Sequence, residues 1–426
     1  MLDAAAVLRP LLGMLVVGLC AAPAPSAAQS TVFVMLSGSC QGCATPCDPP
    51  RILQADAEHG RVVAVFPIAC AGTALRNTAD GRFLVWSERC NGVAGQLRGL
   101  DLTSGAQFAL GPAAAFQSHP SELRLLFPEA QTIVSLTPAG RTAVPAAGCP
   151  DGGFTLSGNG ARLIQTCPSG YVVRTVATGA VVRTIPRTTE DLGPPLLDEQ
   201  GTAAYVLRMN AFNFRTQQLV RVDVGTGAES VPRASLGDTI QGYGSLRLDR
   251  RTGRIVIGTA GFVEPFDPVS LAPAPTFAAG STFSAPPVFH PVLSRAYAWW
   301  SVQPFVDAAD PDRRITLGRA ALGASGDAVV DIAVGPHPPA PAGLTATVVG
   351  RQVTLTWSAG ARSPMLTGYD LEVGSAPGAS DLVRVPVAVT SFAAAAVPPG
   401  AYYIRVRARN HAGQSAASNE ILVTVP

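Results

Sequence analysis

The sequence Arg51-Ile-Leu-Gln-Ala-Asp-Ala-Glu-His-Gly-Arg-Val-Val-Ala-Val-Phe-Pro-Ile68 consists of an apolar run, a turn with Asp and Gly, and a second apolar run. Short apolar runs that are bounded by Asp, Gly and Pro are typical of β-strands joined by tight turns. The same arrangement recurs many times before residue 335. We therefore expect a chain built mainly from repeated antiparallel hairpins.

Two kinds of turn recur along the chain. The first precedes an apolar run and contains Asp-Gly or Asn-Gly, as at Asp80-Gly81, or a His-Pro pair, as at His119 and His290. The second follows an Asp-x-x-Thr-Gly pattern. Its copies lie at Gly60, Asp101–Gly105, Gly140, Thr178-Gly179 and Thr226-Gly227, with weaker forms at Ser270-Leu271 and Ser325-Gly326. The repeat length of about 44 residues, with four short strands per repeat, is typical of β-propeller blades.

The sequence therefore predicts an all-β fold, a seven-bladed β-propeller over residues 29–335, with six or eight blades as alternatives. The first blade lacks a strand at its start, where Val32–Leu36 would be the second strand. Val329–Val334 could supply the missing strand from the other end of the propeller and close the ring.

Both kinds of turn should lie on one face of the propeller, because successive turns of an up-and-down sheet alternate between its two ends. The other face should then carry the longer and more variable connections, where binding usually occurs on a rigid frame. The expected connections are Gly38–Pro50, Ser87–Leu97, Asn210–Arg215, Trp300–Asp312 and the stretch Arg187–Pro195.

The repeats resemble the YVTN-type propellers of exported bacterial proteins. The resemblance rests on Asp56-Ala-Glu-His-Gly-Arg-Val-Val-Ala-Val-Phe-Pro67 and on Ala177-Thr-Gly-Ala-Val-Val-Arg-Thr-Ile-Pro186. It implies a fold and not a reaction.

After a Pro-rich linker at residues 336–342, the pattern changes to longer alternating strands over residues 343–426. This part resembles a fibronectin type III domain, a β-sandwich. Trp357 matches the core Trp of that family, and Tyr402 matches its tyrosine-corner position. Arg405, Arg407 and Arg409 would then face solvent. The family implies a spacer or adhesive module.

Residues 1–28 have the features of a secretory signal peptide. Arg9 supplies the positive charge, Leu11–Leu19 the apolar segment, and Ser26-Ala27-Ala28 the small residues before a cleavage site. A lipoprotein signal ending at Cys20 is an alternative. Either reading predicts an exported protein, which is periplasmic, secreted or at the cell surface, with no transmembrane segment in the mature chain.

Composition narrows the function classes. Charged residues make up 14% of the chain, and its formal net charge is +2. Without a basic cluster, a nucleic-acid partner is not expected. The sequence has no Lys, which excludes Schiff-base chemistry on a Lys side chain.

Seven cysteines follow the signal region. We expect Cys70–Cys90 and Cys149–Cys167 to form disulfides, because each pair is centred on a predicted hairpin turn. In Cys40-Gln-Gly-Cys43-Ala-Thr-Pro-Cys47 we expect a Cys40–Cys47 disulfide, with Cys43 free or paired between chains. The competing interpretation, a metal or iron–sulfur site, lacks a fourth ligand nearby.

Candidate ligand-binding residues lie in the predicted variable connections. They are Glu190, Asp191, Asn210, Phe212, Phe214, Arg215, Trp300 and Phe305. Aromatic rings beside amide and guanidinium donors suit a protein or glycan partner. The alternative for each aromatic residue, Trp299 included, is packing between blades.

No complete catalytic, metal or cofactor motif is recognisable, so none is assigned. Asp307–Asp312 could bind Ca²⁺ or form a solvated loop. Our first hypothesis is a binding or scaffold protein. The alternative is a lyase or glycoside hydrolase that uses loop carboxylates such as Glu190 or Asp310, so whether the chain is an enzyme stays open.

Overall fold

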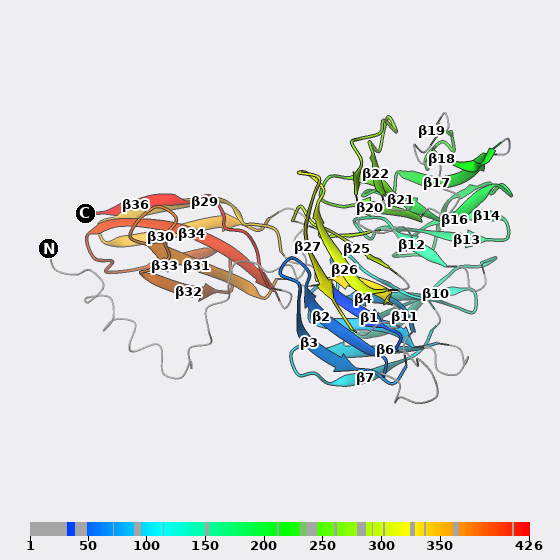
Figure 1. Cartoon of the computed structure of the whole chain (residues 1–426). Helices are drawn as coiled ribbons and strands as arrows, with labels where there is room; N and C mark the ends of the chain where they lie inside the picture. Colours follow the sequence, from blue (N-terminus) through cyan, green and yellow to red (C-terminus); the bar gives the residue numbers. More distant parts are fainter. Residues whose placement is uncertain are drawn as a thin grey trace. The chain divides into compact units, whose positions relative to one another are not determined.

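The computed structural model describes residues 32–38, 49–70, 72–88, 95–113, 115–149, 153–210, 213–230, 233–234, 245–259, 262–278, 287–291, 293–300, 303–323, 329–335, 338–360, 366–410 and 413–426. All regular elements within these ranges are β-strands. The chain divides into two compact units, Ser30–Pro336 and a unit that contains His337–Pro426 (Figure 1).

Among the described residues of the N-terminal unit, seven four-stranded antiparallel sheets are present, here called blades 1 to 7 and listed from the innermost strand outward. Blade 1 is β28 (Val329–Val334), β1 (Val32–Leu36), β2 (Arg51–Asp56) and β3 (Arg61–Pro67). Blade 2 is β4 (Gly72–Asn77), β5 (Phe83–Glu88), β6 (Gln96–Asp101) and β7 (Gln107–Pro112). Blade 3 is β8 (Gln117–Ser118), β9 (Leu125–Glu129), β10 (Thr132–Thr137) and β11 (Gly140–Pro145).

The later blades follow the same order. Blade 4 is β12 (Phe154–Leu156), β13 (Arg162–Cys167), β14 (Gly170–Thr175) and β15 (Val181–Ile185). Blade 5 is β16 (Asp191–Leu197), β17 (Ala203–Asn210), β18 (Asn213–Asp223) and β19 (Arg233–Ala234). Blade 6 is β20 (Ser245–Asp249), β21 (Arg254–Thr259), β22 (Phe262–Phe266) and β23 (Phe277–Ala278). Blade 7 is β24 (Val288–Phe289), β25 (Ala296–Trp300), β26 (Gln303–Asp310) and β27 (Ile315–Ala321).

The ring closes by the strand exchange that the sequence predicts. β28 pairs antiparallel with β1, with Val334 opposite Val32 and Ala333 opposite Phe33. The innermost strands also contact one another in a closed cycle, from β28 through β4, β8, β12, β16, β20 and β24 back to β28. In Figure 1 the yellow strands of blade 7 accordingly lie beside the blue strands of blade 1. The unit is therefore a β-propeller.

The apolar core of the propeller lies between its blades. Phe33 and Met35 of blade 1 pack against Leu75 and Trp86 of blade 2, and all four side chains are buried. Inner strands are covered on both faces, so they are nearly continuous apolar runs rather than alternating ones. The outermost strand β3 instead has an alternating exposed and half-buried pattern.

The turn between the third and fourth strands has one design in several blades. In blade 2 the Asp101 side chain accepts a hydrogen bond from Thr103 N (2.8 Å), and Gly105 N donates to Asp101 O (2.7 Å) with φ +73°. Leu271 (φ +55°) and Arg314 (φ +59°) occupy the position of this Gly in blades 6 and 7. The turn of blade 7 is thus Asp310–Arg314. The predicted copy at Ser325-Gly326 was wrong, and it lies outside the described residues.

The two His-Pro pairs form turns, as predicted from their repeat positions. His119 and His290 are buried, and each begins the turn after an innermost strand. Nδ1 of His290 accepts a hydrogen bond from Leu293 N (2.8 Å), and Nδ1 of His119 accepts one from Ser121 N (3.4 Å).

The described residues of the C-terminal unit form two sheets that share one apolar core. One sheet is β29 (Ala342–Val349), β30 (Gln352–Ser358) and β33 (Ser391–Ala394). The other is β32 (Val383–Val387), β31 (Gly368–Gly374), β34 (Gly400–Asn410) and β35 (Gly413–Gln414), with β36 (Ile421–Val425) paired to β34. Trp357, Tyr402, Ile404 and Val406 lie in this core, as their alternation predicts. An apolar cavity of ≈ 140 Å³ remains beside Leu355 and other core side chains.

Candidate functional site

The two kinds of predicted turn lie on one face of the propeller. In blade 2, Asp80-Gly81 joins β4 to β5 and Asp101–Gly105 joins β6 to β7, so both turns lie at the same end of the sheet. We call this end in every blade the turn face. The opposite end, where the second strand passes to the third and one blade passes to the next, is called the loop face.

Connections on the loop face vary in length. Blade 3 uses the two residues Ala130 and Gln131, which both have positive φ (+42° and +65°). Blade 1 uses the long stretch between Leu36 and Arg51, most of which lies outside the described residues. The long connection of blade 1 thus lies on the loop face, whereas the second and third strands of blades 3 to 7 are each joined by two residues.

The candidate residues of blade 5 lie closer to the sheet than the sequence predicted. Asn210 is the last residue of β17 and pairs with Asn213, the first residue of β18. Phe214 and Arg215 thus belong to β18, and the predicted connection Asn210–Arg215 shortens to two residues. Phe212 lies outside the described residues, and only the backbone is described for Asn210, Phe214 and Arg215.

The long loop predicted at Trp300–Asp312 was wrong, because most of it is strand β26. Trp300, described by its backbone alone, ends β25. Phe305 lies in β26, where the Arg319 guanidinium sits 4.0 Å from the centre of its ring. Val306 and Ala308, two residues apart, both point into the core. This alternation is typical of a strand, but the aspartates of the segment made it resemble a loop. Trp299 is buried between blades, as the alternative interpretation held.

Asp191 connects the first two strands of blade 5. It is buried, and it is the first residue of β16, not part of a loop as predicted. Its carboxylate accepts hydrogen bonds from Thr188 N (3.0 Å), Thr188 Oγ1 (2.9 Å) and Arg208 Nε (2.7 Å). Arg208 also bonds Glu229 (2.8 and 3.0 Å), and these hydrogen bonds, with those to Asp191, raise the pKa of Arg208. Glu190 is half-buried, and its carbonyl oxygen accepts from Met209 N (2.8 Å).

The three aspartates of blade 7 have separate partners. Asp307 forms a two-point ion pair with Arg319, with Nη2 at 2.9 Å. Asp310 accepts from Ser294 Oγ (2.7 Å) and from the amides of the turn that it begins. Burial raises the pKa of Asp310, but these hydrogen bonds bring it below its usual value. The hydrogen bond from Arg251 (2.7 Å) lowers the pKa of Asp312. The part of the chain that the structure describes contains no cluster of three potential metal ligands.

The carboxylates considered for acid–base chemistry do not come together. Glu190 immediately precedes β16 at the loop face, whereas Asp310 ends β26 at the turn face of a different blade. Asp191, the neighbour of Glu190, and Asp310 are already held by protein donors. Glu190 and Asp310 are therefore not placed to act together on one substrate.

One disulfide is confirmed. Cys149 and Cys167 are bonded, with Cα atoms 4.7 Å apart, and they close the open end of the β12–β13 hairpin. Cys70 is also in a disulfide. Its predicted partner Cys90 lies outside the described residues, as do Cys40, Cys43 and Cys47. Disulfides are typical of oxidising compartments outside the cytosol. Among the described residues there is no helix suited to crossing a membrane.

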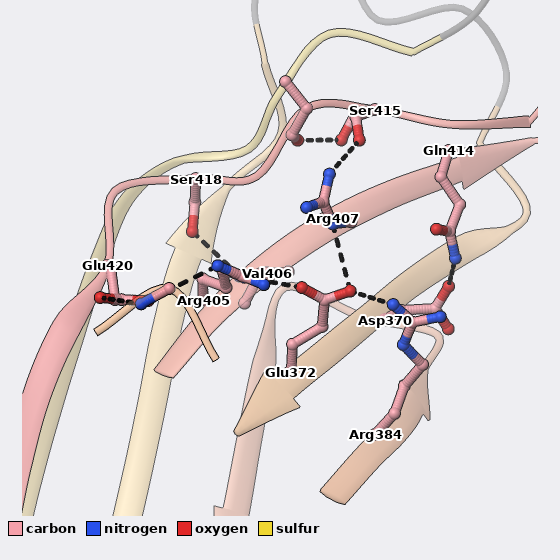
Figure 2. A network of polar contacts seen from close by, with 12 residues as sticks. Asp370, Glu372, Arg384, Arg405, Val406, Arg407, Gln414, Ser415, Ser418 and Glu420 are labelled. Carbon is pink, nitrogen blue, oxygen red and sulfur yellow. Dashed lines mark hydrogen bonds and ion pairs between the residues drawn. The ribbon is translucent and has the colours of Figure 1, made fainter. Parts of the chain in front are cut away.

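A charge network in the C-terminal unit escaped the sequence analysis (Figure 2). Glu372 of β31 has a side chain only 1% exposed, and it accepts from Arg405 Nε (2.7 Å), from Arg407 Nε (3.1 Å) and from Arg384. Arg405 and Arg407 alternate outward from the core as predicted, but they pair with Glu372 and are only 16% and 24% exposed. The register pairs Glu372 with Arg405. In the sequence, this network could have been inferred from Glu372, a charged residue at an outward position of the strand Tyr369–Val373.

Comparison with known proteins places the chain in no family. No family model matches it, and no curated protein matches it. Among solved structures, dihydro-heme d1 dehydrogenase NirN in complex with DHE is similar at a TM-score of 0.49 and 13% identity, over 73% of this chain and 78% of that one. The β-propeller domain of Cps50 (Swd1) from Myceliophteria thermophila is similar at a TM-score of 0.43 and 13% identity, over 64% and 94%.

Proposed function

We propose that this chain is an exported binding or scaffold protein whose loop face recognises a protein or glycan of the cell envelope or extracellular space. The observation that carries the proposal is the contrast between the two faces. Turn-face loops such as Asp101–Gly105 are short and bonded internally. Loop-face connections differ from blade to blade, which is the usual place for recognition on a rigid frame.

We assign the propeller repeats to the YVTN type and the C-terminal unit to the fibronectin type III β-sandwiches. Tyr402 Oη donates a hydrogen bond to Pro398 O (2.9 Å), the contact expected of a tyrosine corner. Trp357 packs edge-on against Tyr369 in the core, with ring centres 5.5 Å apart. Such a module would space the propeller from its attachment or add an adhesive surface.

Export supports the same function. Residues 1–28 would act as the signal peptide, and the mature chain would be periplasmic or secreted. The Cys149–Cys167 bond supports an oxidising location, since cytosolic disulfides are rare.

The test compares loop-face and turn-face variants of the full chain on a glycan array and in pull-downs from cell-envelope extracts. The double variant Phe212→Ala/Trp300→Ala should reduce binding of any specific partner by at least about tenfold, as for loss of aromatic anchors. The control Val269→Ala removes a side chain that is 74% exposed in a turn-face loop, and it should bind as the wild type does. Full binding by the folded double variant would refute the assignment to these residues.

A further inference from the structure

The seven innermost strands, β28, β4, β8, β12, β16, β20 and β24, form the hub of the propeller. One register position recurs on all of them. In blades 2 to 7 it lies two residues before the turn that leads to the second strand, and in blade 1, where no turn joins β28 to β1, it is the residue that pairs with Phe33. Around the ring from blade 1 to blade 7 it is occupied by Ala333, Arg76, Gln117, Thr155, Leu196, Arg247 and Val288. We call this the hub position.

Most polar side chains at the hub position tie one innermost strand to another. Gln117 Nε2 donates to Phe154 O (3.2 Å), and Thr155 Oγ1 donates to Pro195 O (2.8 Å), in each case in the next blade. Arg76 Nη1 donates to Asp331 Oδ2 (2.9 Å) on the closing strand β28. These polar groups are therefore accounted for by the packing of the ring.

Arg247 differs from these three. Within the described part of the chain it has no hydrogen bond and no ion pair, and its Nε atom is buried without a partner. Burial lowers the pKa of Arg247, the charge of Arg76 lowers it further, and the charge of Asp331 raises it. The three charged groups are thus within electrostatic reach of one another, although they come from blades 6, 2 and 1.

Asp331 does not neutralise both arginines. Its Oδ2 already accepts from Arg76 and from Leu75 N (2.8 Å), and its Oδ1 from Ile332 N (2.9 Å). Two guanidinium groups therefore interact electrostatically with one carboxylate, and both oxygens of that carboxylate already accept hydrogen bonds. Leaving a buried cation without a counter-charge is costly, and a guanidinium presents its N–H groups as a fork that fits the oxygens of a carboxylate or phosphate.

We propose that the hub binds a small free oxyanion, a carboxylate or a phosphate, through Arg247 with the support of Arg76. Arg247 as a whole is half-buried, so the site is not fully closed to solvent. This site is separate from the loop-face residues, and it would be occupied whether or not those residues bind a partner.

Isothermal titration of the full chain with inorganic phosphate and with succinate, at constant ionic strength set with chloride, tests the proposal. We expect saturable binding of at least one of them to the wild type and at least tenfold weaker binding to Arg247→Gln. The control Arg254→Gln removes an exposed Arg on the neighbouring strand β21 and should bind as the wild type does.

Asp331→Asn keeps an acceptor for Leu75 N but removes the competing negative charge, so it should bind the anion more tightly than the wild type does. That variant also decides the outcome if Arg247→Gln does not fold. Three results overturn the proposal: no binding of either anion to the wild type, equal binding by folded Arg247→Gln, or no tightening in Asp331→Asn.

Discussion

Replacing Glu372 with Gln should destabilise the C-terminal unit more than any other single charge removal on that sheet. The Glu372 carboxylate contacts three arginines, Arg384, Arg405 and Arg407, and its side chain is 1% exposed. Gln has the same shape and keeps one acceptor oxygen. It removes the negative charge, however, and leaves three cations adjacent to one another (Figure 2).

The magnitude follows from the geometry. Two unit charges about 4 Å apart interact by about 4 kcal/mol at an effective dielectric constant of about 20. Removing one partner of a buried ion pair costs about 3–5 kcal/mol. The three arginine side chains are 37%, 16% and 24% exposed, so water solvates part of their charge. We therefore expect a loss of about 3 kcal/mol in the unfolding free energy at neutral pH, at the lower end of that range.

The assay is denaturant unfolding of the full chain, with hydrogen exchange on peptides from β34 to assign the transition to the C-terminal unit. Glu420→Gln is the matched control. Glu420 lies 3.7 Å from Nη1 of the same Arg405, with a side chain 26% exposed, so its loss should cost less than about 1 kcal/mol. A loss in Glu372→Gln no larger than in this control would refute the reasoning.

The pH dependence gives a second readout of the same variant. Burial raises the pKa of Glu372, but the hydrogen bond from Arg405 and the charges of Arg407 and Arg384 bring it below its ordinary value of 4.5. Its stabilisation is therefore complete above the pKa of the unfolded chain and is lost as the pH falls through the folded pKa. The gap between wild type and Glu372→Gln should shrink on acidification below about pH 5. A gap that does not change with pH contradicts the assignment.

Three further changes test other parts of the fold. Cys149→Ala/Cys167→Ala should lower propeller stability by about 3 kcal/mol in denaturant unfolding, because the bond closes a loop with a sequence separation of 18; an unchanged midpoint would contradict this. Arg314→Gly should raise the melting temperature, because it relieves a φ of +59° worth about 1 kcal/mol, whereas Leu271→Gly should lower it by removing a buried side chain. Tyr402→Phe should cost about 1 kcal/mol in chemical denaturation through its lost hydrogen bond, and a neutral result would argue against a tyrosine corner.

Much of the architecture could be read from the sequence because it depends on local chemistry. An Asp whose side chain accepts from amides two and three residues later, followed by Gly at positive φ, specifies a turn within five residues, as at Asp101–Gly105. Repetition of such turns predicted the blades. The apolar run at Val32–Leu36 has no partner strand before it, which indicated that a strand from the other end of the propeller closes the ring. Where Arg314 replaced the Gly, the local signal disappeared, and the last turn was placed incorrectly.

Contacts between residues far apart in the chain were decided by the tertiary structure alone. Asp191 follows turn-like sequence and Asp310 begins a turn, yet they lie at opposite ends of different sheets. Glu372 meets Arg405, and Arg247 comes within reach of Asp331, through strand register and ring closure. A charged side chain has the same local sequence signal whether water or a buried counter-ion surrounds it. Its role therefore depended on which distant strands the fold brought beside it.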